Sequence, residues 1–170
     1  KAAGEALAGH LRQLLLNQFD GARGMILSAY WPIKGEPDLR SLMGELHEAG
    51  VAIAFPVVGT RFAPLIFRRW TPETRMVRGD WNIPVPPSDS PVVTPTIALA
   101  PLVGWTEDGY RLGYGGGYFD RTLAVLKPRP FVIGIGFDAA RLSTIYPQPH
   151  DIRLDMILTE AGVRVQRDIA

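Results

Sequence analysis

Residues 25–55 read MILSAYWPIKGEPDLRSLMGELHEAGVAIAF, and the fold can be predicted from this stretch. Residues 25–30 and 51–55 are short apolar runs, as expected of strands that are buried on both faces of a sheet. Between them, apolar residues at spacings of three and four predict a helix that opens at Pro37 and stops at Gly50. The order strand, helix, strand is typical of a right-handed βαβ unit, which predicts a parallel sheet.

The rest of the chain extends this unit on both sides. Amphipathic periodicity predicts helices, short apolar runs predict buried strands, and the proline-rich residues 81–95 are expected to form a surface connection. The expected fold class is α/β, a three-layer α/β/α sandwich with a mostly parallel sheet. The additional elements are helices over 6–19 and 118–126, and strands over 63–70, 97–103, 131–136 and 156–159, the last of which is the final strand expected.

The composition fits one domain over residues 1–170. Hydrophobic residues make up 46% of the chain, enough for one core, and 18 Lys plus Arg nearly balance 17 Asp plus Glu. This balance, without charge blocks, argues against nucleic-acid and membrane partners, and no apolar run approaches the roughly 20 residues of a membrane helix. The absence of cysteine excludes disulfides and thiolate metal sites. We expect a cytoplasmic monomer, with residues missing upstream of Lys1 because there is no initiator Met.

The most informative motif is RLGYGGGYFDR, residues 111–121, which lies between a predicted buried strand and a predicted helix. Its four glycines let the backbone adopt positive φ and approach a ligand closely, because no Cβ is in the way. Their N–H groups and the positive end of the following helix would form an anion site at the carboxyl ends of the strands. The alternative is a turn that uses glycine only to connect strand and helix.

Neither of the two common nucleotide fingerprints fits this loop. Counted from Gly113, the dinucleotide motif Gly-x-Gly-x-x-Gly places Tyr118 where its last glycine is required. A P-loop ends in Gly-Lys-Ser or Gly-Lys-Thr, and neither tripeptide occurs in the chain. The Gly-x-Ser-x-Gly elbow of serine hydrolases is also absent, so acyl transfer through a serine has no support.

Two acidic residues are candidates for a metal site near this loop. Asp120 follows the glycines closely, and Asp151 lies just before the last predicted strand. Mg²⁺ takes one or two carboxylates together with water and nucleotide phosphates. The alternatives are that Asp120 only stabilises a helix N-terminus and that Asp151 only caps a turn. The three histidines of the chain do not have the spacing of a zinc site.

At these residues the sequence resembles the 5-formyltetrahydrofolate cyclo-ligase family, also called methenyltetrahydrofolate synthetases. Three blocks carry the resemblance: YWPIKGEPDL at 30–39, the glycine motif at 111–121, and a closing segment from IGIGFD at 133–138 to HDIRLDMILTE at 150–160. The segment WNIPVP at 81–86 resembles the family's connection ahead of the glycine motif. The resemblance implies one cyclo-ligase domain whose architecture is similar to that of phosphosugar isomerases.

The resemblance also implies roles for individual residues. Asp120 and Asp151 are implied to bind Mg²⁺, and Arg111 and Tyr118 to act in catalysis. The residues implied in ATP binding are Arg111, Leu112, Gly113, Tyr114, Gly115, Gly116, Gly117, Tyr118 and Phe119. Those implied in folate binding are Trp31, Glu36, Gly115, Gly116, Gly117 and Tyr118.

The implied reaction is the ATP- and Mg²⁺-dependent conversion of 5-formyltetrahydrofolate to 5,10-methenyltetrahydrofolate. A phosphoryl group would pass from ATP to the formyl oxygen, a neighbouring folate nitrogen would attack, and phosphate would leave. Such chemistry needs little covalent help from the protein, because positioning, Mg²⁺ and backbone donors supply most of what the transition state requires.

Two departures from the family pattern keep other functions open. Members commonly carry a Lys and an Arg four residues apart in the first helix, and no such pair precedes Leu7 here. Tyr114 and Gly116 stand where members often have basic side chains. A non-catalytic paralogue that binds folate or nucleotide is therefore the main alternative. A phosphosugar isomerase acting without ATP is a third hypothesis, supported only by analogy of architecture.

Overall fold

The structure is a computed structural model that describes residues 2–33, 35–61, 63–112, 118–143 and 153–166. The helices in these ranges are α1 (Ala2–Phe19), α2 (Arg40–Glu48) and α3 (Tyr118–Val125), with short 3-10 turns η1 (Asp20–Ala22), η2 (Asp80–Asn82) and η3 (Asp138–Ala140). The strands are β1 (Ile26–Ser28), β2 (Ala52–Val57), β3 (Ile66–Trp70), β4 (Val77–Arg78), β5 (Pro84–Val85), β6 (Val92–Val93), β7 (Ile97–Pro101), β8 (Gly104–Trp105), β9 (Arg111–Leu112), β10 (Phe131–Ile135), β11 (Met156–Thr159) and β12 (Gly162–Gln166).

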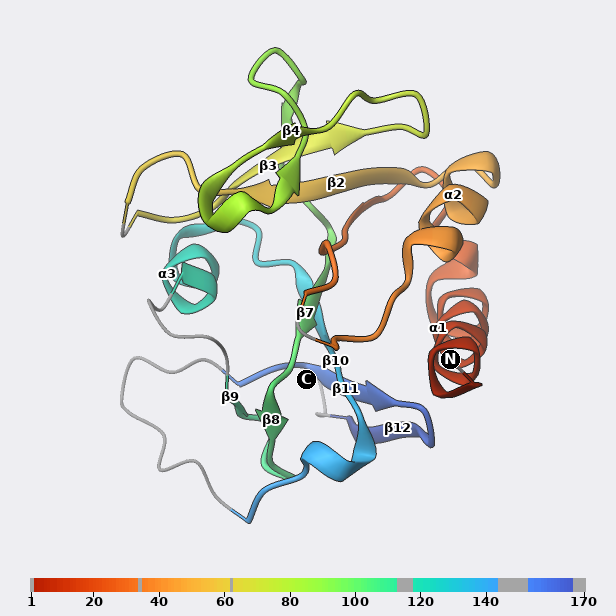
Figure 1. The fold of residues 1–170 in the computed structure, drawn as a ribbon. Helices are drawn as coiled ribbons and strands as arrows, with labels where there is room; N and C mark the ends of the chain where they lie inside the picture. Colours follow the sequence, from red (N-terminus) through yellow and green to blue (C-terminus); the bar gives the residue numbers. More distant parts are fainter. Residues whose placement is uncertain (1, 34, 62, 113–117, 144–152, 167–170) are drawn as a thin grey trace.

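One sheet organises the described part of the chain (Figure 1). Its strand order is β12-β11-β10-β7-β1-β2-β3-β6. The central strands from β11 to β2 run parallel to one another, whereas β12, β3 and β6 are antiparallel to their neighbours. Ile26 of β1 lies opposite Ala52 of β2 in parallel register, so the predicted βαβ unit forms. The predicted α/β fold with a mostly parallel sheet is confirmed.

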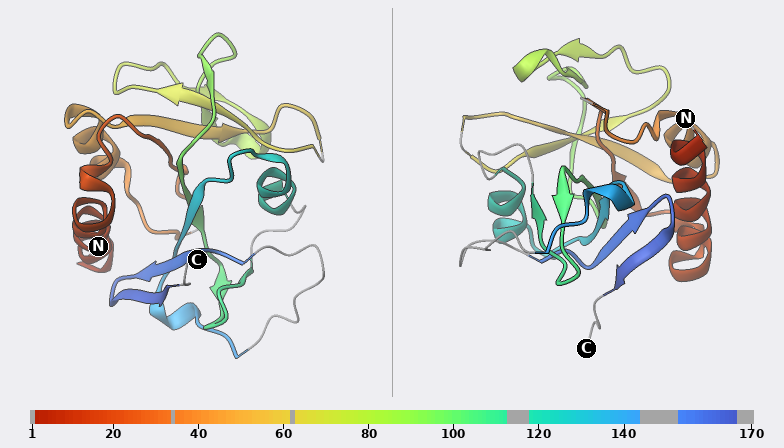
Figure 2. Two further views of the ribbon diagram at one scale, coloured as in Figure 1. Left: turned by 180° about the vertical axis from the view of Figure 1, so that it is seen from behind. Right: turned by 60° about the horizontal axis from the view of Figure 1, so that its bottom comes forward.

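Helices lie on both faces of this sheet (Figures 1 and 2). On one face, α1 and α2 pack over a buried cluster that includes Ile53 and Leu99. On the other face, Phe119 and Leu123 of α3 join a second cluster with Val132 of β10. Each fully buried leucine stabilises the fold by about 1.5–3 kcal/mol relative to an exposed one. At the three-and-four spacing of its apolar face, α1 buries Leu7, Leu11, Leu14 and Leu15.

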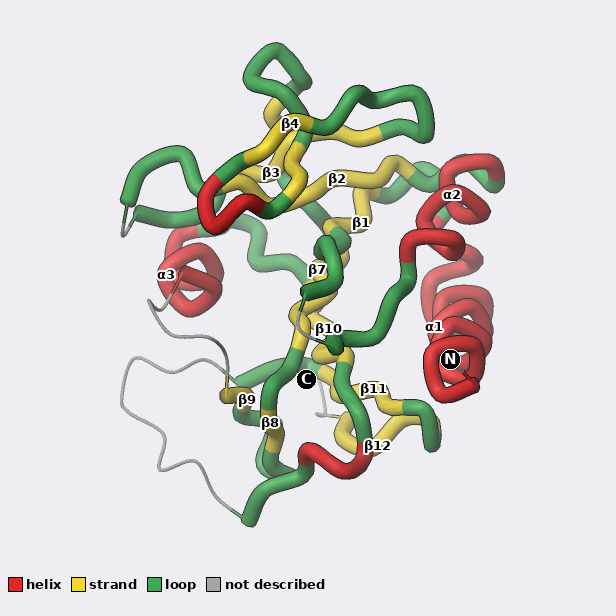
Figure 3. Tube along the Cα trace, viewed as in Figure 1, coloured by secondary structure: helices red, strands yellow, loops and turns green. Residues whose placement is uncertain are grey.

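Several element boundaries differ from the sequence prediction (Figure 3). Helix α2 begins at Arg40 and not at Pro37, because the Tyr30 hydroxyl donates to the Pro37 carbonyl at 2.6 Å and Leu39 takes the N-cap position. The proline-rich connection contains β6, which adds to the sheet at its edge, where proline is tolerated. A further strand, β12, follows β11, so the prediction that β11 is the last strand was wrong.

The start of β10 is fixed by a buried carboxylate. Asp155 is 6% exposed, and its Oδ1 and Oδ2 accept hydrogen bonds from Arg129 Nη1 at 3.1 and 3.0 Å. Val132 N donates to Asp155 Oδ2 at 2.8 Å. Asp155 thereby ties β10 to the start of β11. Among the residues that the structure describes, none of the helices has the length and apolar character that a membrane span requires.

Candidate active site

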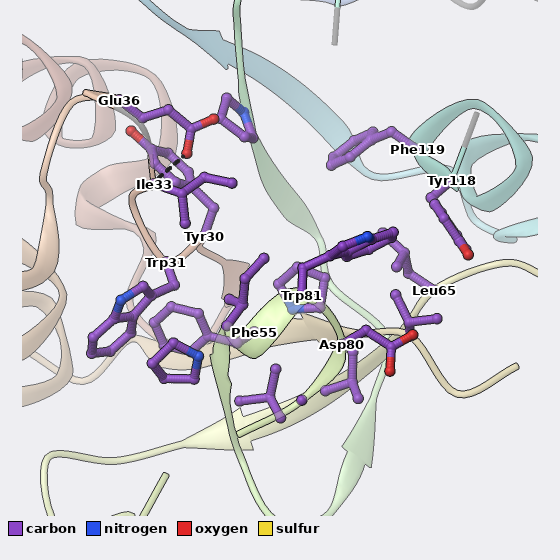
Figure 4. A pocket seen from close by; sticks show the side chains of 18 of the residues that line it. Tyr30, Trp31, Ile33, Glu36, Phe55, Leu65, Asp80, Trp81, Tyr118 and Phe119 are labelled. Atoms are coloured by element: carbon purple, nitrogen blue, oxygen red, sulfur yellow. Dashed lines mark hydrogen bonds between the residues drawn. The ribbon is translucent and has the colours of Figure 1, made fainter. Parts of the chain in front are cut away.

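A cavity of about 610 Å³ opens at the carboxyl ends of β1, β2 and β7 (Figure 4). The strand order reverses at this place: from β1 the sheet grows through β2 to β3, and from β7 it grows the other way through β10 to β11. Ligands of open α/β sheets bind at such a point. The charged and aromatic side chains that line the cavity are Tyr30, Trp31, Glu36, Phe55, Arg61, Asp80, Trp81, Arg111, Tyr118 and Phe119.

Glu36 is a carboxylate with unused hydrogen-bonding capacity inside this cavity. Its Oε1 accepts a hydrogen bond from Ile33 N at 3.0 Å, while its Oε2 is buried and has no partner among the described residues. Burial raises the pKa of Glu36, and the Ile33 amide and the positive charge of Arg111 oppose that rise. A buried carboxylate oxygen without a donor is a suitable acceptor for an N–H or O–H group of a ligand.

An aromatic wall stands beside Glu36. The rings of Trp31 and Phe55 lie 6.4 Å apart between centroids, and the Arg40 guanidinium sits 4.9 Å from the Trp31 ring centre. Burial raises the pKa of Tyr30 far above its ordinary value, and the charges of Glu36 and Asp38 add to this effect, so Tyr30 stays a neutral donor to Pro37. Such a wall offers apolar contact to a flat ring system.

Arg111 connects the two sides of the cavity. Its Nη1 donates to the Pro101 carbonyl at the carboxyl end of β7 at 2.9 Å, and its guanidinium lies 5.0 Å from the Phe119 ring centre. Burial lowers the pKa of Arg111, but the negative charges of Asp120 and Glu36 act in the opposite direction. Arg111 therefore interacts at once with β7, with α3 and with the Glu36 carboxylate.

The first turn of α3 forms the side of the cavity opposite the aromatic wall. Tyr118 and Phe119 line the cavity, and half-buried Asp120 follows in the same turn. The buried Thr122 hydroxyl donates to the Tyr118 carbonyl at 2.6 Å and accepts a hydrogen bond from Leu65 N at 2.8 Å. This single hydroxyl ties the connection between β2 and β3 to the start of α3.

Trp81 is a cavity residue to which sequence reasoning assigned no role. It is 70% exposed and adopts φ 57° in the turn between β4 and β5, and its ring meets the Tyr118 ring edge-on at 5.8 Å between centroids. A left-handed conformation is uncommon for a large side chain, and backbone strain of this kind clusters at ligand sites. The one indication of this role in the sequence was an aromatic residue at the start of the proline-rich segment 81–86. The segment has no helical or strand periodicity that would have placed Trp81.

The structure thus brings several predicted site residues into one place. Trp31, Glu36, Arg111, Tyr118 and Phe119 come from two segments far apart in sequence and line the same cavity. For Leu112 only its place in β9 is described. Nowhere in the described ranges do three His, Asp or Glu side chains come together as a metal cluster. The predicted site residues that lie outside the described ranges are Gly113, Tyr114, Gly115, Gly116, Gly117 and Asp151.

Comparisons with known proteins agree with one another. Residues 3–160 match the profile of the 5-formyltetrahydrofolate cyclo-ligase family. The chain is 29% identical over 163 residues to the 5-formyltetrahydrofolate cyclo-ligase of Mycolicibacterium smegmatis, covering 91% of this chain and 80% of that protein. The Escherichia coli K12 protein of the same name is 30% identical over 145 residues, which cover 81% of this chain and 79% of that protein.

A solved structure leads to the same conclusion. The 5,10-methenyltetrahydrofolate synthetase of Aquifex aeolicus superposes with a TM-score of 0.77 at 26% identity, covering 96% of this chain and 83% of that one. The matched region contains β1, the glycine motif and β11, and hence every described residue of the cavity. This chain belongs to the 5-formyltetrahydrofolate cyclo-ligase family.

Proposed function

We propose that this protein converts 5-formyltetrahydrofolate to 5,10-methenyltetrahydrofolate with consumption of ATP. The observation that carries the proposal is the convergence of Trp31 and Glu36 with Arg111 and Tyr118 on one cavity of about 610 Å³. Family membership supports the same activity. The cavity lies at the reversal of strand order, where ligands of open α/β sheets bind.

The folate is proposed to bind with its ring system at the Glu36 end of the cavity. The aromatic wall of Trp31 and Phe55 provides apolar contact for a flat ring. The Glu36 Oε2, which has no partner among the described residues, can accept a hydrogen bond from a ring N–H. Once the bound ligand excludes water, this N–H is the donor that satisfies the buried oxygen. With the ring bound in this way, Glu36 would orient it with the formyl group toward the α3 side.

The nucleotide is proposed to bind on the side formed by Arg111 and α3. The two flanks of the glycine segment, β9 and the first turn of α3, both border the cavity through Arg111 and Tyr118. Backbone N–H groups of residues 113–117 and the N-terminus of α3 would then face the phosphates. Asp120 and Asp151 supply the carboxylate oxygens that Mg²⁺ prefers, and the bound ion would neutralise phosphate charge.

The chemistry follows from bringing the two ligands together. The formyl oxygen attacks the terminal phosphorus of ATP, so ADP leaves and the oxygen becomes part of a good leaving group. The neighbouring folate nitrogen then attacks the formyl carbon and releases its proton, the carbon–oxygen bond breaks, and inorganic phosphate departs. Arg111 and Tyr118 would stabilise charge beside the transferring group, and two ligands that fill the cavity would leave little room for competing water.

The test is an absorbance assay for the methenyl product with purified protein. We expect product only when 5-formyltetrahydrofolate, ATP and Mg²⁺ are all present, with one phosphate released for each product formed. Calorimetric titration of each ligand should accompany the assay, because tight binding of both without turnover would identify the non-catalytic paralogue instead. Turnover of a sugar phosphate without ATP would favour the isomerase hypothesis.

A further inference from the structure

We propose that Arg61 supplies the cation that recognises an anionic group of the ligand at the α3 side of the cavity. This inference rests on the proposed function and deepens it. The anionic group is either a phosphate of the nucleotide or a carboxylate at the tail of the folate. Both are oxyanions that a guanidinium binds through paired N–H donors.

The glycine motif has cations only at its two ends, Arg111 and Arg121. Between Arg111 and Arg121 the sequence contains no Lys or Arg, and its only charged residue is Asp120. Backbone N–H groups and a helix N-terminus carry only partial charges, about half an elementary charge at the helix end. Apart from Arg111, a full positive charge for a phosphate or carboxylate would therefore come from another element that borders the cavity.

Arg61 is placed to provide that charge. It lies in the connection between β2 and β3, its side chain is exposed, and it lines the same cavity as Tyr118. The Leu65 amide bonds to the Thr122 hydroxyl at 2.8 Å, which fastens this connection to the first turns of α3. Figure 1 shows the connection running beside α3. Arg61 is thus held near the end of the cavity that the glycine motif borders.

The other charged residues of the cavity are less suited to this role. Arg111 donates to the Pro101 carbonyl and lies against Phe119, and it is already assigned to the transferring group. Glu36 and Asp80 also line the cavity, and their negative charges would oppose an entering anion. Asp80 and Tyr118 lie on the same side of the cavity (Figure 4), and the charge of Arg61 would offset the repulsion from Asp80.

The experiment compares Arg61→Gln and Arg61→Lys with the native chain and with Arg69→Gln as control. Arg69 is an exposed arginine of β3 that does not line the cavity, so its replacement removes the same charge elsewhere. Dissociation constants for MgATP and for 5-formyltetrahydrofolate are measured separately by calorimetry. Michaelis constants for both are measured in the absorbance assay.

We expect Arg61→Gln to weaken one of the two ligands by about tenfold or more and to leave the other within about twofold. Arg61→Lys should retain part of the affinity, and Arg69→Gln all of it. Weakened MgATP identifies a phosphate as the partner, and weakened folate identifies a carboxylate. Unchanged affinity for both ligands, or an equal loss for both, would overturn the proposal.

The proposed function is judged separately from these constants. If the native chain binds both ligands but forms no methenyl product, the catalytic proposal fails while the dissociation constants still decide the role of Arg61. If the native chain binds neither ligand, both proposals are wrong.

Discussion

Replacement of Glu36 by Gln should show that this carboxylate lowers the free energy of unfolding and, at the same time, strengthens folate binding. The substitution keeps the size of the side chain, and its amide oxygen can still accept the hydrogen bond from Ile33 N. It replaces a carboxylate whose Oε2 is buried and has no partner in the part of the chain that the structure describes. Because burial raises the pKa of Glu36, the folded state holds its proton to higher pH than the unfolded chain does.

The sign of the pH dependence follows from this difference. Above the ordinary carboxyl pKa, the unfolded chain has already released the proton that the folded chain retains, so the native protein loses stability as pH rises through the raised pKa of Glu36. The Glu36→Gln variant lacks this loss. As pH rises from the ordinary carboxyl pKa through the raised pKa of Glu36, we expect the free energy of unfolding of the variant to gain about 1 kcal/mol relative to that of the native protein. This is the lower end of the penalty for an unpaired buried group, since Arg111 offsets part of the cost.

Urea unfolding followed by circular dichroism at a series of pH values measures this shift. Glu48→Gln, at an exposed position of α2, is the matched control and should show no shift relative to the native chain. The same Glu36→Gln protein should bind 5-formyltetrahydrofolate about tenfold to a hundredfold more weakly, because a carboxylate acceptor is lost. Parallel stability curves for the native and Glu36→Gln proteins, or unchanged folate affinity, would refute this account of Glu36.

Three further substitutions test other parts of the structure. Asp155→Ala should lower the free energy of unfolding by about 3 kcal/mol in urea titrations, because Arg129 Nη1 and the Val132 amide lose the carboxylate that accepts from them. Glu45→Ala removes an exposed ion pair and should cost less than about 1 kcal/mol, and equal losses would contradict the role of burial. Asp120→Asn should abolish methenyl formation while circular dichroism and the unfolding midpoint stay native, and full ATP-dependent activity would exclude Asp120 as a metal ligand. Gly134→Ala should destabilise the fold by about 1–3 kcal/mol, since a Cβ there would come within 2.6 Å of Leu154 Cδ1, and an unchanged melting temperature would show that the core relaxes freely.

The central part of the fold could be predicted because its strands are buried on both faces. A run such as residues 97–101 is apolar throughout, and every residue of it is buried except Pro101, which is half-buried. Strand β12 was missed for the opposite reason. It lies at the sheet margin, where Val163 is 43% exposed, so no continuous apolar run marks it. The start of α2 was misplaced because Pro37 suggested a first helical position, while a hydrogen bond from the Tyr30 hydroxyl, seven residues earlier, holds that carbonyl outside the helix.

The cavity was predictable only where a motif pointed to it. Trp31, Glu36 and Arg111 belong to segments whose resemblance to the family was visible in the sequence, and the structure places all three on one cavity. Arg61 and Trp81 reach the same cavity through connections that have no periodicity. Their placement depends on tertiary contacts, such as the bond from Leu65 to Thr122, that one sequence alone does not reveal.

Because the strand order reverses between β1 and β7, changes in the sequence should affect the crevice to different degrees along the sheet. The two wings of the sheet extend away from that junction, so the outermost strands, β6 and β12, are the farthest in the strand order from the crevice. Length changes at either margin should therefore alter solubility or assembly before they alter ligand affinity. Changes in the short segment that follows β1, by contrast, would reshape the crevice directly, because Tyr30, Trp31 and Glu36 of that segment supply part of its wall.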